Sequence, residues 1–210
     1  MRNRLLANTL AFCLVAITAS WVHANTWDID PVHTSVQFSV RHMTISNVRG
    51  EFGKVTGTVS SEGSDPKTVR IDVTIDATTI NTHEPKRDAD LKGPNFLDVE
   101  HYPTIVFKSK KIEPAGPGKW KLIGDLTIHG VTKEVTLRVE GPSEQVKDPY
   151  GNLRVAAHAS TTINRKDFGL KWNKVLETGG VLVGEQVAIT IDVEAVKKAA
   201  PAAGAHAGGL

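Results

Sequence analysis

Apolar and polar residues alternate along most of the chain. In one clear case Val36, Phe38 and Val40 are separated by Gln37 and Ser39. The same spacing recurs in five further stretches, which are residues 69–77, 120–128, 135–139, 153–161 and 187–193. A period of two is typical of β-strands with one solvent-exposed face and one buried face. Two further strands are predicted over residues 51–60, where glycines interrupt the pattern, and over residues 104–112.

Turn-forming residues separate these stretches, and no long helical pattern interrupts them. The turn signals are Asp65-Pro66, residues 114–118, His129-Gly130, Gly141-Pro142, residues 148–151 and Gly179-Gly180. About eight long antiparallel strands in succession predict an all-β domain, either an up-and-down barrel or a sandwich. Closure into a barrel would remove exposed strand edges.

Residues 84–99 break the alternation, because they are polar first and apolar afterwards. Pro85 suits the first turn of a helix, and Gly93-Pro94 would stop it. We therefore predict a short helix over residues 85–92, which would cover one end of the barrel.

The first residues have the layout of a secretory signal peptide. Arg2 and Arg4 precede an apolar run over residues 5–19, and Val22-His23-Ala24 offers a cleavage site. We predict that residues 1–24 are removed and that the mature chain is periplasmic. The alternative is a retained membrane anchor, for which the run is at the short limit. Cys13, the only cysteine, lies inside this segment, so the mature chain would form no disulfide.

Length and charge narrow the class of protein. Residues 25–198 suit one domain, and residues 199–210 are almost entirely Ala and Gly, which predicts a disordered tail. Arg2 and Arg4 account for the formal net charge of +2, so the mature chain would be neutral. Neutrality argues against nucleic-acid binding, which needs an excess of Lys and Arg.

Four segments resemble the YceI-like, polyisoprenoid-binding family. The first is WDIDPVHTSVQF from Trp27, and the second is VRHM from Val40 followed by VRGEF from Val48. The third is EPKRDADL from Glu84 with FLDVEHYP from Phe96, and the fourth is GDLTIHGVTK from Gly124. Their order and spacing run through nearly the whole mature domain, and together they are specific.

The resemblance implies an extended, eight-stranded, lipocalin-like barrel around a long apolar tunnel. It also implies non-catalytic binding of a long-chain isoprenoid or similar amphiphile, such as a prenyl chain, a quinone or a prenyl pyrophosphate, with no other cofactor. The family often carries histidine after Arg-Asp-Ala, where this chain has Asp90. That change places an anion where relatives have a potential cation.

The inward rows suit an apolar ligand, because they are aliphatic and include the small residues Ala77, Gly124, Ala157 and Ala159. An eight-stranded barrel either fills its interior or holds a ligand. The residues predicted to line a ligand tunnel are Val36, Phe38, Val40, Ile71, Val73, Ile75, Phe107, Leu122, Leu126, Val135, Leu137, Ala157, Ala159, Phe168, Trp172, Ile189 and Ile191. Phe168 and Trp172 are expected at a portal or as a plug.

Polar candidates are few. His42, Arg49 and Arg87 are the predicted head-group contacts, and the alternative for each is a solvated rim or a loop contact. Asp28, Asp30 and His33 suggest a metal site, but this spacing is common by chance, so we expect none.

Two other functions compete with lipid binding. One is a structural or stress-response protein of the cell envelope with a filled barrel. The other is an enzyme acting on a lipid-like substrate. The absence of a nucleophile elbow, an HExxH motif and a phosphate loop from the mature chain argues against this alternative. Membrane spanning after cleavage is not expected, and a homodimer is compatible with the sequence.

Overall fold

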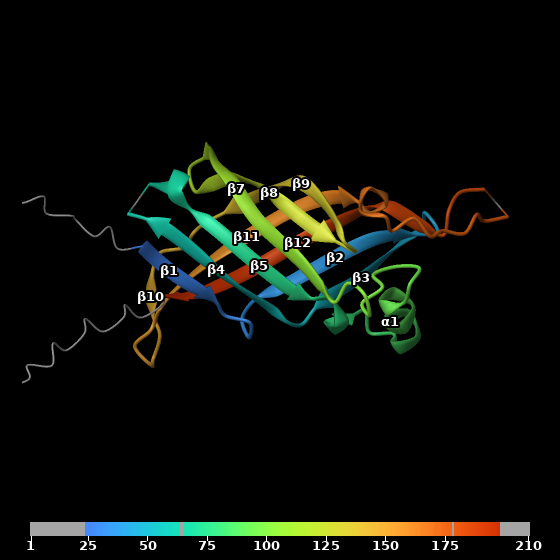
Figure 1. Ribbon diagram of the computed structural model, residues 1–210, viewed down its shortest axis with the longest axis horizontal. Helices are drawn as coiled ribbons and strands as arrows, with labels where there is room; N and C mark the ends of the chain where they lie inside the picture. The colour runs from blue at the N-terminus through green and yellow to red at the C-terminus, as the bar shows by residue number, and fades with distance from the viewer. Residues whose placement is uncertain (1–23, 64, 178, 198–210) are drawn as a thin grey trace, which may run out of the picture.

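The computed structural model describes residues 24–63, 65–177 and 179–197. The described residues are mostly β-strand (Figure 1). Its strands are β1 (Ala24–Ile29), β2 (Ser35–His42), β3 (Ser46–Phe52), β4 (Val55–Glu62), β5 (Arg70–Asp76), β6 (Ile80–Asn81), β7 (Thr104–Gly116), β8 (Lys119–Ile128), β9 (Val131–Glu140), β10 (Val146–Lys147), β11 (Leu153–Asn164) and β12 (Val183–Lys197). The helical segments are η1 (Pro66–Thr68), η2 (Ala77–Thr79), α1 (Pro85–Lys92) and η3 (Arg165–Phe168).

Eight strands form a closed antiparallel barrel. They follow the order β11-β9-β8-β7-β5-β4-β1-β12, and pairing of β12 with β11 closes the ring. The β11–β12 ladder runs without a break from Arg154 opposite Val196 to Asn164 opposite Gln186. The all-β class predicted from the alternating rows is confirmed, and of the two architectures that the rows left open the structure shows the barrel, as the family resemblance implies.

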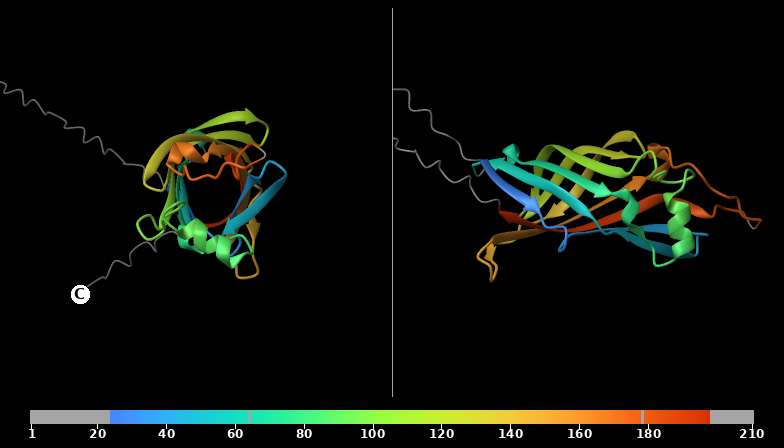
Figure 2. Two further views of the ribbon diagram at one scale, coloured as in Figure 1. Left: turned by 90° about the vertical axis from the view of Figure 1, so that its right-hand side faces the viewer. Right: turned by 60° about the horizontal axis from the view of Figure 1, so that its bottom comes forward.

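An extension lengthens the barrel at one end. Only the last residues of β12 pair with β1, so β12 is free to pair with β2 along Val183–Asp192. β3 and the short β6 follow β2 in the sheet. Figure 1 shows β2, β3 and α1 at one end of the long axis, and the two ends of the described chain at the other. Figure 2 shows the strands as a ring around this axis, with α1 at its rim.

The predicted helix is confirmed over Pro85–Lys92. The Glu84 side chain accepts a hydrogen bond from the Lys86 amide at its start, and Gly93 ends it. Thr82 fastens the helix to β6, because its amide donates to the Asp88 carboxylate at 2.8 Å.

Several element boundaries differ from those predicted, and the barrel strand β1 was not predicted at all. Residues 51–60 form parts of two strands, β3 and β4, because the chain reverses at Gly53 and Lys54 so that Phe52 and Val55 can both be buried. Residues 114–116 belong to β7, where Pro114 is paired with Trp120, so the turn to β8 is shorter than expected.

A β-bulge in β7 changes which residues face inward. The register against β8 shifts between Ser109 and Lys111. Ile105 and Phe107 border the interior before the shift, and Ile112 does so after it, although its parity is opposite.

The predicted signal peptide, except Ala24 at the start of β1, and the predicted tail lie outside the described residues. Within the described part, no helix has both the length and the apolar character needed to cross a membrane.

Candidate ligand-binding cavity

The barrel encloses a cavity of about 820 Å³. This volume lies in the range of small-molecule binding sites. All eight barrel strands and β2 contribute to its wall, which consists mainly of Val, Ile, Leu and Phe side chains. Many of them, such as Val73, Val135 and Ile189, are only partly buried and pack against the fully buried core. The inward rows therefore leave apolar surface free inside the barrel.

Glycine and alanine act differently in shaping this space. A Cβ added at Gly124 would lie 2.5 Å from Cζ of Phe107, so the Phe107 ring occupies the room that the missing side chain leaves. Gly50 accommodates the ring of Phe38 in the same way. Ala77 is buried away from the cavity wall. Of the predicted small residues, only Ala157 and Ala159 border the cavity.

The two ends of the cavity have different chemistry. At the end beneath α1 the wall is apolar, with Leu91, Phe96, Leu97 and Leu170, and Arg165 is the one charged residue among the described residues there. The opposite end, near β10, combines apolar residues such as Trp27 and Trp120 with several polar side chains, which are Asn25, Ser61, Asp65, Ser143, Gln145 and Lys197.

The structure places all but two of the predicted lining residues on the cavity wall. These are Val36, Phe38, Val40, Ile71, Val73, Ile75, Phe107, Leu122, Leu126, Val135, Leu137, Ala157, Ala159, Ile189 and Ile191. Their contact with a ligand stays a prediction.

Phe168 and Trp172 need correction, because neither borders the cavity. Phe168 follows β11 in η3 and is 2% exposed within the core. Trp172 is 37% exposed and packs against Phe96, with ring centroids 5.2 Å apart. Trp172 thus supports a wall residue from behind.

The three predicted head-group residues also lie off the wall. Arg49 is exposed on β3, and His42 lies at the end of β2. Arg87 has a structural role, because its guanidinium donates to the hydroxyl of Thr82 at 2.8 Å and to the Thr82 carbonyl at 2.9 Å. Asp90 is exposed on α1 and does not border the cavity either.

Arg165 is the cationic residue that sequence reasoning missed. It is 4% exposed, and its Nε donates to the Gly184 carbonyl at 2.9 Å. Its two terminal nitrogens donate to the carbonyls of Leu170 and Val183. Burial lowers the pKa of this guanidinium from its ordinary value. In the sequence, Asn164-Arg165-Lys166-Asp167 has the composition of an ordinary exposed turn, so no signal indicated a buried site.

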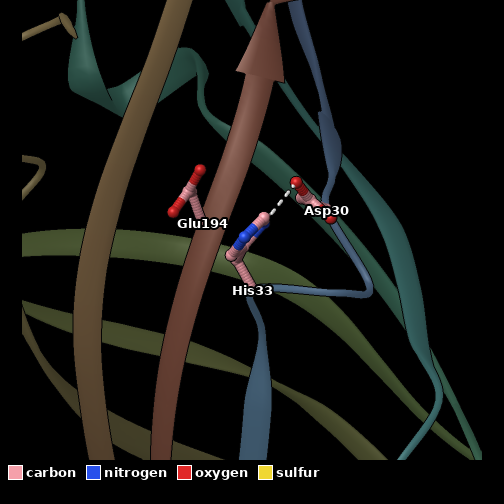
Figure 3. Close-up of side chains that lie close together, drawn as sticks. All are labelled: Asp30, His33 and Glu194. Atoms are coloured by element: carbon pink, nitrogen blue, oxygen red, sulfur yellow. Dashed lines mark hydrogen bonds and ion pairs between the residues drawn. The ribbon is translucent and has the colours of Figure 1, made fainter. Parts of the chain in front are cut away.

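The acidic cluster near the β10 end is held by an arginine. Asp30, His33 and Glu194 lie together (Figure 3), with His33 Nδ1 2.9 Å from Asp30. Arg154 bonds Asp30 at 2.6 Å, Glu194 at 2.5 Å and Asp148 at 2.8 Å. These bonds hold the pKa of Asp30 and of Asp148 well below its usual range. Because Arg154 already supplies the positive charge, the chemistry of this cluster does not favour a metal ion.

The comparisons with known proteins identify the family. The YceI-like domain family matches residues 27–195. A UPF0312 protein of Staphylococcus aureus strain MSSA476 is 34% identical over 167 residues, which cover 79% of this chain and 94% of that protein. This chain belongs to the YceI-like family.

Solved structures show the same YceI-like fold. A Campylobacter jejuni YceI protein is 28% identical with a TM-score of 0.63, covering 76% of this chain and 90% of its own. Burkholderia cenocepacia BcnA is 22% identical with a TM-score of 0.67, covering 79% and 98%. A polyisoprenoid-binding domain from Saccharophagus degradans is 14% identical with a TM-score of 0.62, covering 82% and 98%.

Proposed function

We propose that this YceI-like protein binds a long-chain isoprenoid lipid in its barrel, for transport or storage and without catalysis. The observation that carries the proposal is the apolar cavity of about 820 Å³ inside the closed barrel. A filled barrel, the structural alternative, would leave no such space. The Saccharophagus domain with the same fold is named for polyisoprenoid binding, which supports the ligand class.

The size and polarity of the cavity favour a long apolar chain. β11 has 12 residues, so it is ~40 Å long and extends ~30 Å along the axis of a tilted barrel. Each buried methylene contributes ~0.8 kcal/mol, whereas association costs roughly 4–15 kcal/mol. A prenyl chain along the barrel offsets that cost by its length, which a short metabolite cannot do.

The wall chemistry favours binding over catalysis. Among the described residues that border the cavity, Asp65 is the only carboxylate, and none is histidine or cysteine. Acid–base and nucleophilic catalysis need such groups placed next to the substrate. We further propose that the N-terminal segment directs export and that the lipid is carried in the periplasm.

Filling the cavity tests this proposal. Ala157→Trp places an indole on the wall, and Ala188→Trp places the same group on an exposed position of β12 that does not border the cavity. Binding of geranylgeraniol to the delipidated, refolded protein is measured by displacement of a fluorescent apolar probe.

If the introduced indole keeps two methylenes of the ligand out of the cavity, binding loses about 1.6 kcal/mol, or about tenfold in affinity. Ala157→Trp is therefore expected to weaken binding at least tenfold, and Ala188→Trp to leave it within about twofold. Equal effects of the two substitutions, or no binding by the unaltered protein, would contradict a ligand in the barrel.

A further inference from the structure

Arg165 is a buried cation on the wall of an apolar cavity, and burying a charge costs free energy unless hydrogen bonds or an opposite charge offset the lost hydration. η3 begins at this residue, directly after β11, and the start of β12 and Leu170 surround it. The backbone carbonyls of Leu170, Val183 and Gly184 accept from all three of its nitrogens. A guanidinium has five N–H groups, so these bonds fix its position without using every donor.

No carboxylate forms a direct ion pair with Arg165 within the part of the chain that the structure describes, where backbone carbonyls are its hydrogen-bond partners. Glu185 is the nearest acid along β12, but Lys166 already pairs with it at 2.5 Å. Asp167 is exposed. Arg154, by contrast, has three carboxylate partners. Glu185 therefore acts on Arg165 only through space, and the guanidinium has no hydrogen-bonded carboxylate partner among the described residues.

We propose that Arg165 anchors the head group of the bound lipid, and that this head group is an anionic acceptor, either a phosphate or a carboxylate. The inference rests on the proposed function and adds the chemical class of the head group. Folding has already removed the guanidinium from water and fixed it through backbone carbonyls. An incoming anion therefore gains a charge-assisted bond without the cost of ordering the arginine.

The site also gives the ligand a direction. Arg165 lies at the end of the cavity beneath α1, together with Leu170 and Phe96. The chain would then run through the barrel toward Trp27 and Trp120 at the β10 end.

Lys197 provides a matched control for Arg165. These two are the only Lys or Arg residues among the described residues of the wall, and they lie at opposite ends. Lys197 is exposed and lies over the ring of Trp27, 5.8 Å from its centroid. Arg165→Gln and Lys197→Gln each remove one positive charge from the same cavity.

The experiment compares ligands that share a chain and differ in the head group. Geranylgeranyl monophosphate, geranylgeranoic acid and geranylgeraniol are offered to the unaltered protein, to Arg165→Gln, to Arg165→Lys and to Lys197→Gln. The unaltered protein should bind at least one anion about ten- to a hundredfold more tightly than the alcohol. Arg165→Gln should bring that ratio close to one, whereas Arg165→Lys should keep part of it and Lys197→Gln all of it.

Binding of the alcohol separates the outcomes. Arg165→Gln that binds geranylgeraniol normally is folded, so a lost preference for the anion is then due to the head group. If the unaltered protein binds the alcohol and both anions equally, the role of Arg165 is overturned while lipid binding stands. Equal preference in Arg165→Gln and the unaltered protein overturns it too. If none of the three ligands binds, the proposed function itself fails.

Discussion

At the scale of single residues, glycine and phenylalanine form pairs that build the wall. Gly124 lies on β8 beside β7, which carries Phe107, and Gly50 is paired with Phe38 across β2 and β3. In each pair the ring lies where a glycine side chain would be. The sequence alone suggests that Gly124 leaves room for a ligand, because alternation gives the direction of a side chain and not the space that its neighbour fills.

Gly124→Ala tests this pairing. The added Cβ would lie 2.5 Å from both Cζ of Phe107 and the backbone oxygen of Lys108, and the backbone cannot move away cheaply. We expect a loss of about 1–3 kcal/mol in the free energy of unfolding, which is typical of overpacking, measured by urea denaturation. Gly53→Ala is the control, because its nearest neighbour would be 3.9 Å away. A Gly124→Ala protein as stable as Gly53→Ala would mean that the ring does not need this space.

At the scale of elements, Arg154 joins parts of the chain that are far apart in sequence. Its guanidinium links β11 to Glu194 of β12, to Asp30 directly after β1, and to Asp148 in the turn after β10. These contacts lie at the end of the barrel away from α1. They stabilise the end of the barrel where β1 pairs with β12 and β10 pairs with β11.

This cluster predicts how stability changes with pH. Arg154 lowers the folded-state pKa of Asp30 and of Asp148 below the ordinary value of 3.8. A lowered carboxyl pKa contributes stability that is present above the ordinary value and is lost as pH falls toward the folded value. Arg154→Gln is therefore expected to have a lower Tm than the unaltered protein at pH 7.

The difference in Tm should narrow as the pH falls below about 4, since the unaltered protein then loses the contribution that the variant already lacks. Thermal unfolding followed by circular dichroism between neutral and acid pH measures both proteins. Arg138→Gln is a suitable control, because within the described part of the chain the Arg138 side chain makes only a long hydrogen bond of 3.5 Å to Ser160. A constant difference in Tm across the acid range would contradict the pH linkage.

At the scale of the whole molecule, the barrel has two unlike ends and an apolar interior. The alternation of Val36, Phe38 and Val40 and of the later rows was enough to predict most of the strands and most of the wall, because successive side chains in a strand face opposite sides. The barrel strand β1 was not predicted. The bulge in β7 and the reversal at Gly53 could not be predicted, because register depends on partner strands. Arg165 could not be predicted either, because only folding places it beside the carbonyls of Leu170, Val183 and Gly184.

The most direct test of lipid binding is mass spectrometry of the protein purified from its own host under native conditions. Organic extraction of the folded protein should release a lipid with a prenyl chain, in an amount comparable to the protein, and Ala157→Trp should carry far less of it than Ala188→Trp. If the native protein releases no apolar ligand, and the refolded protein offered prenyl lipids also retains none, the barrel is not a lipid carrier.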